Sequence, residues 1–305
     1  MDATRDIRLA GLELGGTSCV ASFCKGQPTN IIKDYRVPTT TPEETLGKLK
    51  AWLIEQGPFD ALGIACFGPV DLNRNSKTYG YITSTPKTQW RYVDVVGAFV
   101  DLSIPIGFDT DVNAPALAEI TYGPHSYANS SSYITIGTGV GVGVVANREP
   151  IHGLMHTEGG HVMVAKLAND DYQGSCEFHG ACVEGLVNAQ ALAARKHIMP
   201  TDLAKLSDDD AIWSIAANYI AQLCANITYL LSPELIIIGG GVPKRKCLIP
   251  LVREHFQQIV NGYLDVNKLK YHIDEYIVSS AFGDRIGMIG ACELGKRALD
   301  TVTRQ

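Results

Sequence analysis

The sequence lacks any apolar run long enough to cross a bilayer. Runs such as Leu235–Ile238 are far shorter than the roughly 20 residues that a membrane-spanning helix needs. It also lacks an excess of basic residues, because 26 Lys and Arg stand against 32 Asp and Glu, for a formal net charge of -6. This balance offers no basic surface to nucleic acid or to an acidic membrane. Residues 1–6 do not follow the basic-then-apolar order of a secretory signal, since Asp2 and Asp6 interrupt them, and we expect a cytoplasmic protein.

The two common nucleotide-binding loops are also missing. Neither G-x-G-x-x-G nor G-x-x-x-x-G-K-[ST] occurs, and the glycine-rich run Gly139–Gly143 is expected to continue as a strand instead of opening a helix. No linker or low-complexity stretch divides the chain. With 46% hydrophobic and 19% charged residues, the composition is that of a globular enzyme and excludes a disordered chain.

Eight cysteines are present, but their distribution does not predict disulfides. Six of them are scattered through apolar stretches, where reduced core residues are expected in a chain without a signal. These six are Cys19, Cys24, Cys66, Cys224, Cys247 and Cys292. Cys176 and Cys182 lie in a different setting, close to two histidines.

Apolar runs and glycine turns predict two similar α/β halves. Each half opens with a hairpin around a Gly/Thr turn, first in Ile7–Cys24 and again in Tyr133–Val145. Further expected strands are Ile31–Val37, Ala61–Cys66, Pro105–Phe108 and Leu235–Ile238. One helix is expected to begin after Thr41, an N-cap residue followed by Pro42, and another after the turn Asp109–Asp111. Further helices are expected near Val93–Val100, Gly185–Arg195, Asp208–Leu231 and Gly287–Leu299.

This order indicates an α/β fold of two lobes with a cleft between them. We expect a small N-terminal domain over residues 1–122, with the C-terminal helix of residues 287–305 packing back on it. The larger C-terminal domain would span residues 123–286.

Three glycine turns could let backbone amides approach a phosphate, because glycine places no Cβ in the way. They are Leu14–Thr17, Ile136–Gly139 and Gly239–Gly241, each following an apolar strand. Either of the first two alone is better explained as a tight hairpin turn. Together the three turns favour a nucleotide held between the two lobes.

The most specific local pattern is His161-x14-Cys176-x2-His179-x2-Cys182. Thiolate and imidazole ligands at this spacing suit tetrahedral Zn²⁺, and four protein ligands leave no position for a substrate water, so the metal would be structural. The alternative is that two reduced cysteines and two surface histidines meet this spacing by accident.

Two carboxylates are candidates for chemistry at a sugar. Asp111, beside Asn113 at a strand-to-helix junction, could act as a general base, although an N-cap is the simpler interpretation. Glu158, three residues before His161, could hydrogen-bond sugar hydroxyls, or it could be a plain solvated acid.

Taken together, these motifs resemble those of the ROK family, sugar kinases and sugar-responsive repressors with the actin/hexokinase/Hsp70-like (ribonuclease H-like) fold. The resemblance runs from about Leu9 to Leu299. It implies Mg·ATP and structural Zn²⁺ as cofactors and a homodimer that acts on a hexose. From the acidic charge balance we expect no nucleic-acid or membrane partner. The ATP-binding residues it implies are Glu13, Gly15, Gly16, Thr17, Thr138, Gly139, Gly239, Gly240 and Gly241. The sugar-binding residues it implies are Glu158, His161, Gly68 and Asn113, with Asp111 as general base.

Further roles follow from the same resemblance. His161 would bind zinc through one ring nitrogen and the sugar through the other, together with Cys176, His179 and Cys182. From its position alone, and not from the resemblance, we expect Glu13 to act on Mg²⁺ through water. The loop that contains Gly68 is explained equally well as a plain turn.

The chain departs from the commonest pattern of this family at three places. The metal loop contains a histidine, Thr110 replaces a sugar-binding asparagine, and Glu13 replaces an aspartate. The first two departures, with the segment Thr83–Trp90, resemble the bacterial fructokinase branch, which implies phosphorylation of fructose at its 6-hydroxyl.

Three alternatives stay open. The chain could be a glucokinase, mannokinase or amino-sugar kinase on the same scaffold. It could also be a non-catalytic sugar sensor, although the acidic charge and a phosphate strand within ten residues of Met1 disfavour a DNA-binding repressor. The third alternative is a catalytically silent zinc module.

Overall fold

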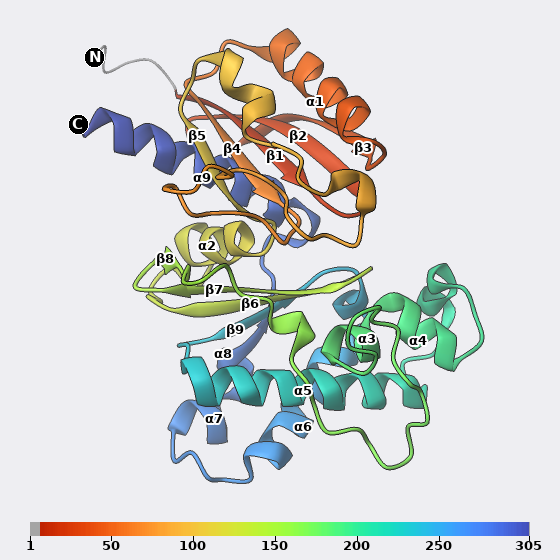
Figure 1. Cartoon of the computed structure of the whole chain (residues 1–305). Coiled ribbons are helices and arrows are strands. Elements are labelled where there is room, and N and C mark those ends of the chain that lie inside the picture. Colours follow the sequence, from red (N-terminus) through yellow and green to blue (C-terminus); the bar gives the residue numbers. More distant parts are fainter. Residues whose placement is uncertain (1–6, 305) are drawn as a thin grey trace. The chain divides into compact units, whose positions relative to one another are not determined.

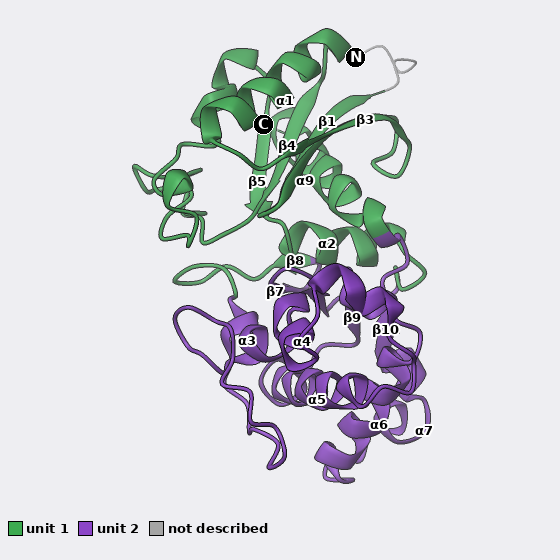
Figure 2. Cartoon of the chain, turned by 90° about the vertical axis from the view of Figure 1, so that its right-hand side faces the viewer, with its two compact units in different colours: residues 1–126, 149–157, 284–305 green, residues 127–148, 158–283 purple. Residues whose placement is uncertain are grey.

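The computed structural model describes residues 7–304. The segment 1–6, which bears on the expectation about a secretory signal, and residue 305 lie outside the described residues. The chain forms two compact units (Figure 2). Unit 1 contains residues 7–126, 149–157 and 284–304, and unit 2 contains residues 127–148 and 158–283. Within the described part of the chain, no helix is long and apolar enough to cross a membrane.

Unit 1 is built on a five-stranded mixed sheet in the order β3-β2-β1-β4-β5. Its strands are β1 (Arg8–Leu14), β2 (Ser18–Lys25), β3 (Ile31–Pro38), β4 (Ala61–Cys66) and β5 (Ile106–Thr110). The predicted hairpin is present, because β1 pairs antiparallel with β2. On its other side β1 is parallel to β4, which is parallel to β5, so three strands end at one edge.

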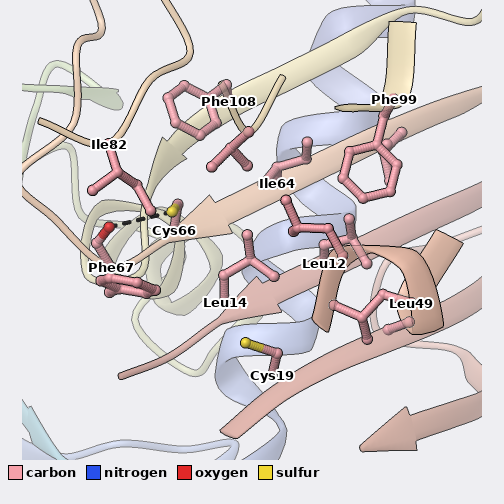
Figure 3. Close-up of a cluster of buried hydrophobic side chains, with 14 of the residues drawn as sticks. Leu12, Leu14, Cys19, Leu49, Ile64, Cys66, Phe67, Ile82, Phe99 and Phe108 are labelled. Atoms are coloured by element: carbon pink, nitrogen blue, oxygen red, sulfur yellow. Dashed lines mark hydrogen bonds between the residues drawn. The ribbon is translucent and has the colours of Figure 1, made fainter. Parts of the chain in front are cut away.

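Two helices cover the sheet of unit 1, α1 (Pro42–Gln56) and α9 (Ile286–Thr303) (Figure 1). Thr41 caps α1 as predicted, since its side chain accepts a hydrogen bond from the Glu44 amide at 3.3 Å. Alternation along β1 divides the two faces. Leu12 and Leu14 lie in the same buried cluster as Leu49 of α1 (Figure 3). The alternate residues of β1, such as Gly11 and Glu13, face α9 on the other side of the sheet.

A row of three glycines explains how α9 lies so close to the sheet. Gly11, Gly63 and Gly107 are in register on β1, β4 and β5. A Cβ on Gly63 would lie 1.7 Å from the Ala291 carbonyl oxygen, and one on Gly107 would lie 2.2 Å from that of Leu294. Only a strip without side chains leaves room for the helix backbone at this distance.

The remaining helical segments of unit 1 are α2 (Asn113–Tyr122) and the 3-10 turns η1 (Thr88–Trp90), η2 (Gly97–Leu102) and η6 (Gly283–Arg285), the last of which begins at the final residue of unit 2. The helix predicted near Val93–Val100 is present only in part, because helical structure begins at Gly97 as the 3-10 turn η2. Val95 and Val96 donate to the Gly80 carbonyl, and Gly97 donates to the Asp94 carboxylate at 2.7 Å, so these amides are not available to a helix. β5 also runs further than predicted and includes Asp109 and Thr110.

Unit 2 repeats the strand pattern of unit 1. Its strands are β6 (Ser131–Ile136), β7 (Val140–Ala146), β9 (Ile236–Gly239) and β10 (Ile277–Ser279), and the two-residue strand β8 (Glu149–Pro150) follows β7 in the chain. The order β2-β1-β4-β5 of the first sheet recurs as β7-β6-β9-β10 in the second. The pairing senses recur as well, one antiparallel hairpin followed by two parallel pairs. The internal repetition inferred from the two glycine hairpins is therefore confirmed in the topology.

The helical segments of unit 2 surround one long buried helix. They are α3 (Val183–Val187), α4 (Ala189–Arg195), α5 (Ala211–Leu231), α6 (Leu248–Val260), α7 (Asn267–Tyr271) and α8 (Ile273–Tyr276), with 3-10 turns η3 (Gly159–His161), η4 (Pro200–Lys205) and η5 (Val242–Lys244). The single helix predicted over Gly185–Arg195 is two helices. Asn188 divides them, because it adopts an extended conformation and its Oδ1 accepts the Ala191 amide at 2.7 Å as the N-cap of α4.

Candidate active site

The carboxyl ends of three parallel strands bring together the candidate residues of unit 1. Leu14 of β1 is in register with Cys66 of β4, which is in register with Thr110 of β5. The turn at Gly15 follows the first of these residues, the loop of Gly68 follows the second, and Asp111 follows the third. The Asp111 amide donates to the Cys66 carbonyl at 3.0 Å, which continues the ladder one residue further. This edge is where open α/β sheets bind their ligands.

The Gly15–Gly16 turn is held from two sides. Within the hairpin, the Gly15 amide donates to the Ser18 carbonyl at 3.2 Å, and a Cβ on Gly15 would lie 2.8 Å from that oxygen. Directly after β3, the Thr39 hydroxyl donates to the Gly15 carbonyl at 2.7 Å and the Thr39 amide donates to the Thr17 carbonyl at 3.0 Å. The turn is thus a preformed structure, and the exposed Thr17 lies at its tip.

Glu13 faces α9, on the opposite side of β1 from the α1 cluster. A Cβ on Gly287 would lie 2.1 Å from the Glu13 carboxyl carbon, so that glycine makes room for the longer acid. Burial raises the pKa of Glu13 to about 7, with Arg36 opposing and Asp284 adding to the rise. Its Oε2 is enclosed and has no hydrogen-bond partner among the described residues. A carboxylate in this position could hold a cation near the turn.

Asp111 stands beside an ordered group of polar side chains. Asp109 is buried, and its Oδ1 accepts from the Thr110 amide at 2.7 Å and from Asn113 Nδ2 at 2.9 Å. Its Oδ2 lies 2.8 Å from His152 Nε2. The N-cap position of α2 is Val112, which makes no side-chain cap bond, and the Thr110 hydroxyl accepts the Asn113 amide at 3.0 Å.

The loop of Gly68 is anchored by a second histidine. The Val70 amide donates to His156 Nε2 at 3.0 Å, so the ring proton is on Nδ1, which lies 3.2 Å from the Thr157 carbonyl. Burial lowers the pKa of His156, which keeps it in this neutral form. The loop is therefore a fixed part of unit 1.

In unit 2 the other two glycine turns also lie at one edge. Thr135 of β6 is in register with Gly239 of β9, so Thr138 and Gly139 follow one strand while Gly240 and Gly241 follow its parallel neighbour. Gly240 has a φ of +96° and its Cβ would lie 2.4 Å from the Ile136 carbonyl oxygen, a position that only glycine fits without strain.

Glu158 and His161 flank a pair of glycines packed on β7. A Cβ on Gly160 would lie 1.9 Å from the Val140 carbonyl oxygen, and the His161 amide donates to the Glu158 carbonyl at 3.0 Å. Burial raises the pKa of Glu158 to about 7, and the charge of Glu184 adds to the rise. The Glu158-Gly-Gly-His161 motif therefore holds the Glu158 and His161 side chains at the two ends of one short turn.

The four predicted metal ligands come together in unit 2. One ligand atom from each of His161, Cys176, His179 and Cys182 lies within 4.8 Å of the others. The Cys176 sulfur lies 3.7 Å from His161 Nδ1 and 3.6 Å from His179 Nδ1, and the Cys182 sulfur lies 3.7 Å from His161 Nδ1. Zn–S and Zn–N bonds of about 2.3 and 2.0–2.1 Å give a tetrahedron with S···N edges of about 3.6 Å. The donor set and its spacing fit zinc.

Three glycines shape the metal loop. The amides and carbonyls of Cys176 and Gly180 bond each other at 3.2 and 2.9 Å, which closes the turn that carries His179. Cβ atoms on Gly174 and Gly185 would lie 2.0 and 1.9 Å from the Gly180 carbonyl oxygen. Cys182 pairs with Met163 across an isolated bridge, which places its sulfur beside His161.

Sequence reasoning missed several polar contacts around the site. His152 and His156 were not singled out, although two histidines four residues apart next to a glycine-rich segment could have drawn attention. Glu184 was also missed. Its carboxylate accepts the Val140 amide at 3.0 Å and would lie 2.7 Å from a Cβ on Gly139. Glu184 is a single acidic residue in the first turn of a helix, and no sequence pattern around it predicts a contact with Val140.

Comparison with known proteins identifies the family. The ROK family model matches residues 9–298. A fructokinase from Pediococcus pentosaceus is 38% identical over 95% of this chain and 98% of its own length, and one from Lactococcus lactis subsp. cremoris is 41% identical over 87% and 89%. The solved structure of a ROK hexokinase from Thermus thermophilus superimposes with a TM-score of 0.75 at 21% identity, covering 97% of this chain and all of the other, which confirms the fold. Because the family model and these relatives extend over nearly the whole sequence, the chain belongs to the ROK family.

Proposed function

We propose that this protein is a fructokinase, which transfers the γ-phosphoryl group of Mg·ATP to the 6-hydroxyl of fructose. The prediction of an ATP-dependent hexose kinase is confirmed by the family match and by relatives named fructokinase at 38–41% identity. The observation that carries the mechanism is the shared strand edge of unit 1, where Asp111 and the Gly15–Gly16 turn follow strands in register with a common neighbour.

Asp111 is the proposed general base. Its position directly after β5, at the carboxyl edge of the sheet, suits a group that accepts the proton of the attacking sugar hydroxyl. Burial and the charge of Asp111 both raise the pKa of Cys66, which places the carboxylate near the end of β4 as well. Asn113 is fully buried and donates to Asp109, so it would support the residues around Asp111 from inside the unit instead of contacting the sugar.

Backbone amides at the glycine turns would bind the phosphates of ATP. In unit 1 the ATP-binding residues are Gly15, Gly16 and Thr17, with the Gly16 amide as the proposed donor because the Gly15 amide donates to the Ser18 carbonyl. In unit 2 they are Thr138, Gly139 and Gly239–Gly241. When bound, Mg²⁺ neutralises phosphate charge. The enclosed Oε2 of Glu13, which lacks a partner among residues 7–304, fits a role in holding that ion through water.

Zinc is the ion proposed for the Cys/His cluster, where it would be structural because four protein ligands complete a tetrahedron. His161 directs Nδ1 toward both sulfurs, which leaves Nε2 for a sugar hydroxyl. A metal at Nδ1 would fix the tautomer and the ring orientation. Glu158, at the other end of the same turn, is the second proposed sugar ligand. A cytoplasmic location would keep both thiols reduced for this role.

Fructose is favoured over glucose by Thr110 as well as by the relatives. Thr110 is only 2% exposed, and its hydroxyl accepts the Asn113 amide inside the unit. The amide side chain that contacts sugar in the commonest ROK pattern is therefore replaced by a group committed to the fold. A glucokinase would need that contact from another residue.

The test is a coupled ADP-release assay with Mg·ATP and fructose, mannose, glucose or N-acetylmannosamine. We expect turnover selective for fructose, and a loss of about 10²–10⁴-fold in kcat for Asp111→Asn with little change in the affinity for sugar or nucleotide. Thr121→Val, at the far end of α2, serves as a matched control. Turnover selective for another hexose would refute the substrate, and a loss of only a few-fold in Asp111→Asn would refute the base.

A further inference from the structure

A lysine far from the glycine turns in the sequence lies over the first of them. A Cβ on Gly16 would lie 3.4 Å from Lys87 Cε, the only atom beyond its chain neighbours within 4 Å. The end of this side chain therefore borders the turn whose amides are proposed to bind phosphate. Burial raises the pKa of the nearby Cys19 thiol, and the positive charge of Lys87 is one of the effects that oppose this rise.

Lys87 has no acidic partner in the described part of the chain. Other lysines of unit 1, such as Lys48 and Lys50, form ion pairs with Glu44 and Asp101. Across residues 7–304, no carboxylate lies within ion-pair distance of Lys87, which is nevertheless half-buried. A half-buried lysine beside Gly16 makes the turn attractive to an anion.

The backbone of Lys87 is fixed relative to the turn. Three residues later, Trp90 is buried, its amide donates to the Lys87 carbonyl at 2.8 Å, and its indole Nε1 donates to the Thr40 carbonyl at 2.8 Å. Thr39, the neighbour of Thr40, holds both Gly15 and Thr17. Hydrogen bonds made by Trp90 and Thr39 thus connect the segment around Lys87 to the Gly15–Gly16 turn within unit 1.

The other end of the segment is anchored as well. The Thr83 amide and hydroxyl both donate to the Pro69 carbonyl, at 2.7 and 3.1 Å. Pro69 follows Gly68 in the loop after β4. The segment 83–90 is therefore attached to the strand edge that also holds Asp111, and Lys87 projects from a preformed support.

Building on the proposed function, we propose that the Lys87 ammonium binds the γ-phosphoryl group of ATP at the Gly15–Gly16 turn and stabilises it during transfer. In this step the sugar oxygen forms a bond to the γ-phosphorus, its proton passes to Asp111, and the bond from the γ-phosphorus to the bridging oxygen breaks to release ADP. Negative charge spreads over the equatorial oxygens of the transferred group. A compact ammonium next to the turn is suited to neutralise it.

The alternative is that Lys87 only covers the turn with its methylene groups. Lys87→Met keeps that cover and removes the charge, while Lys87→Arg restores a positive charge. Lys77→Met, at an exposed lysine of the same unit, is the matched control. Each variant is assayed for kcat and KM with fructose, for thermal midpoint, and for affinity toward Mg·AMPPNP and Mg·ADP by titration calorimetry.

We expect Lys87→Met to lose about 10²–10³-fold in kcat. It should bind Mg·AMPPNP at least tenfold more weakly, because that ligand carries a γ-phosphoryl group, and bind Mg·ADP as the unmodified protein does. Lys87→Arg should recover part of the kcat, and Lys77→Met should be unchanged.

Two results would overturn the proposal: a kcat for Lys87→Met within threefold of the unmodified protein, or an equal weakening of both nucleotides with a lowered thermal midpoint. The calorimetric comparison also works without turnover. A protein inactive on every hexose would refute the proposed function, while the difference between the two nucleotides would still decide the role of Lys87.

Discussion

His152 Nε2 lies 2.8 Å from Asp109 Oδ2, two residues before the proposed base Asp111. The carboxylate side of this pair is 4% exposed and the imidazole side 41%. Asp109 also accepts a hydrogen bond from Asn113. His152 is therefore the most exposed member of a group of hydrogen-bonded side chains next to Asp111. The pair therefore connects a titratable surface group with the buried framework around Asp111.

The first prediction concerns the pH dependence of this pair. The hydrogen bond to Asp109 raises the pKa of His152, burial opposes it, and the charges of Asp109 and Glu149 add to it. A raised pKa in the folded state means that the pair stabilises the fold fully at acidic pH, and that this stabilisation is lost as pH rises through the folded-state pKa. His152→Asn should therefore destabilise the protein more at pH 6 than at pH 9, measured by urea unfolding. The exposed His197→Asn should show no such trend. Equal destabilisation at both pH values would contradict the ion pair.

The second prediction concerns metal content. The unmodified protein should contain about one zinc per chain by mass spectrometry, and Co²⁺ in its place should give the visible spectrum of a tetrahedral S₂N₂ site. Cys182→Ala should abolish both signals and lower the thermal midpoint, since the turn at Gly180 would lose its cross-link. Cys247→Ala, outside the cluster, should retain both. Full zinc content in Cys182→Ala would exclude the proposed ligand set.

The third prediction concerns the glycine row under α9. Gly63→Ala should lower the free energy of unfolding by about 3 kcal/mol or more, because the new methyl group would meet the Ala291 carbonyl and backbone cannot move aside as a side chain can. Gly47→Ala, at an open position on the exposed face of α1, should raise it by about 0.5–1 kcal/mol. Denaturant titration of both variants provides the measurement. If Gly63→Ala were as stable as the unmodified protein, the close approach of α9 would be wrong.

The fourth prediction concerns a buried ion pair in unit 2. Asp170 accepts from Arg195 Nε at 3.0 Å, from Arg195 Nη2 at 2.7 Å and from the Tyr219 hydroxyl at 2.7 Å. Burial alone would raise the pKa of Asp170, but these hydrogen bonds lower it to about 2. The stabilisation is therefore present above pH 4 and is lost as pH falls toward 2.

Asp170→Asn leaves Arg195 buried without its counter-charge and should lower the free energy of unfolding by about 3–5 kcal/mol at neutral pH. Asp202→Asn breaks the exposed pair with Lys205 and should change it by at most about 0.5 kcal/mol. Thermal scans from pH 7 to pH 2 would measure both. Similar effects from the two substitutions would mean that the Asp170–Arg195 pair stabilises the fold no more than an exposed ion pair does.

Most secondary structure near the proposed site was predictable because it depends on local chemistry. The Gly15–Gly16 and Gly137–Gly139 hairpins follow from glycine between apolar runs, and α1 follows from Thr41 and Pro42. The first turn of the helix expected near Val93–Val100 did not form, for the opposite reason. Its amides bond to Gly80 and to the Asp94 side chain, and such competition from partners outside the expected helix is not visible in an apolar pattern.

The metal cluster was predictable in membership and not in geometry. Spacing alone selected His161, Cys176, His179 and Cys182, because few residue types bind zinc and four fell within one short stretch. That both sulfurs face His161 Nδ1 depends on the Cys176–Gly180 turn and on the bridge between Met163 and Cys182. Those contacts form only when β7 and α3 support the loop from both sides.

The sequence by itself determined the family, the glycine turns and the four residues of the proposed zinc site, since each depends on residue type at short spacing. Tertiary structure alone decided which distant side chains meet at the edge of β1, β4 and β5. Lys87 reaches Gly16 across about 70 residues, and His152 reaches Asp109 across 43. Such contacts depend on strand order, on register and on the glycine row that admits α9. They are set by the packing of the whole unit, and a local pattern contains no information about it.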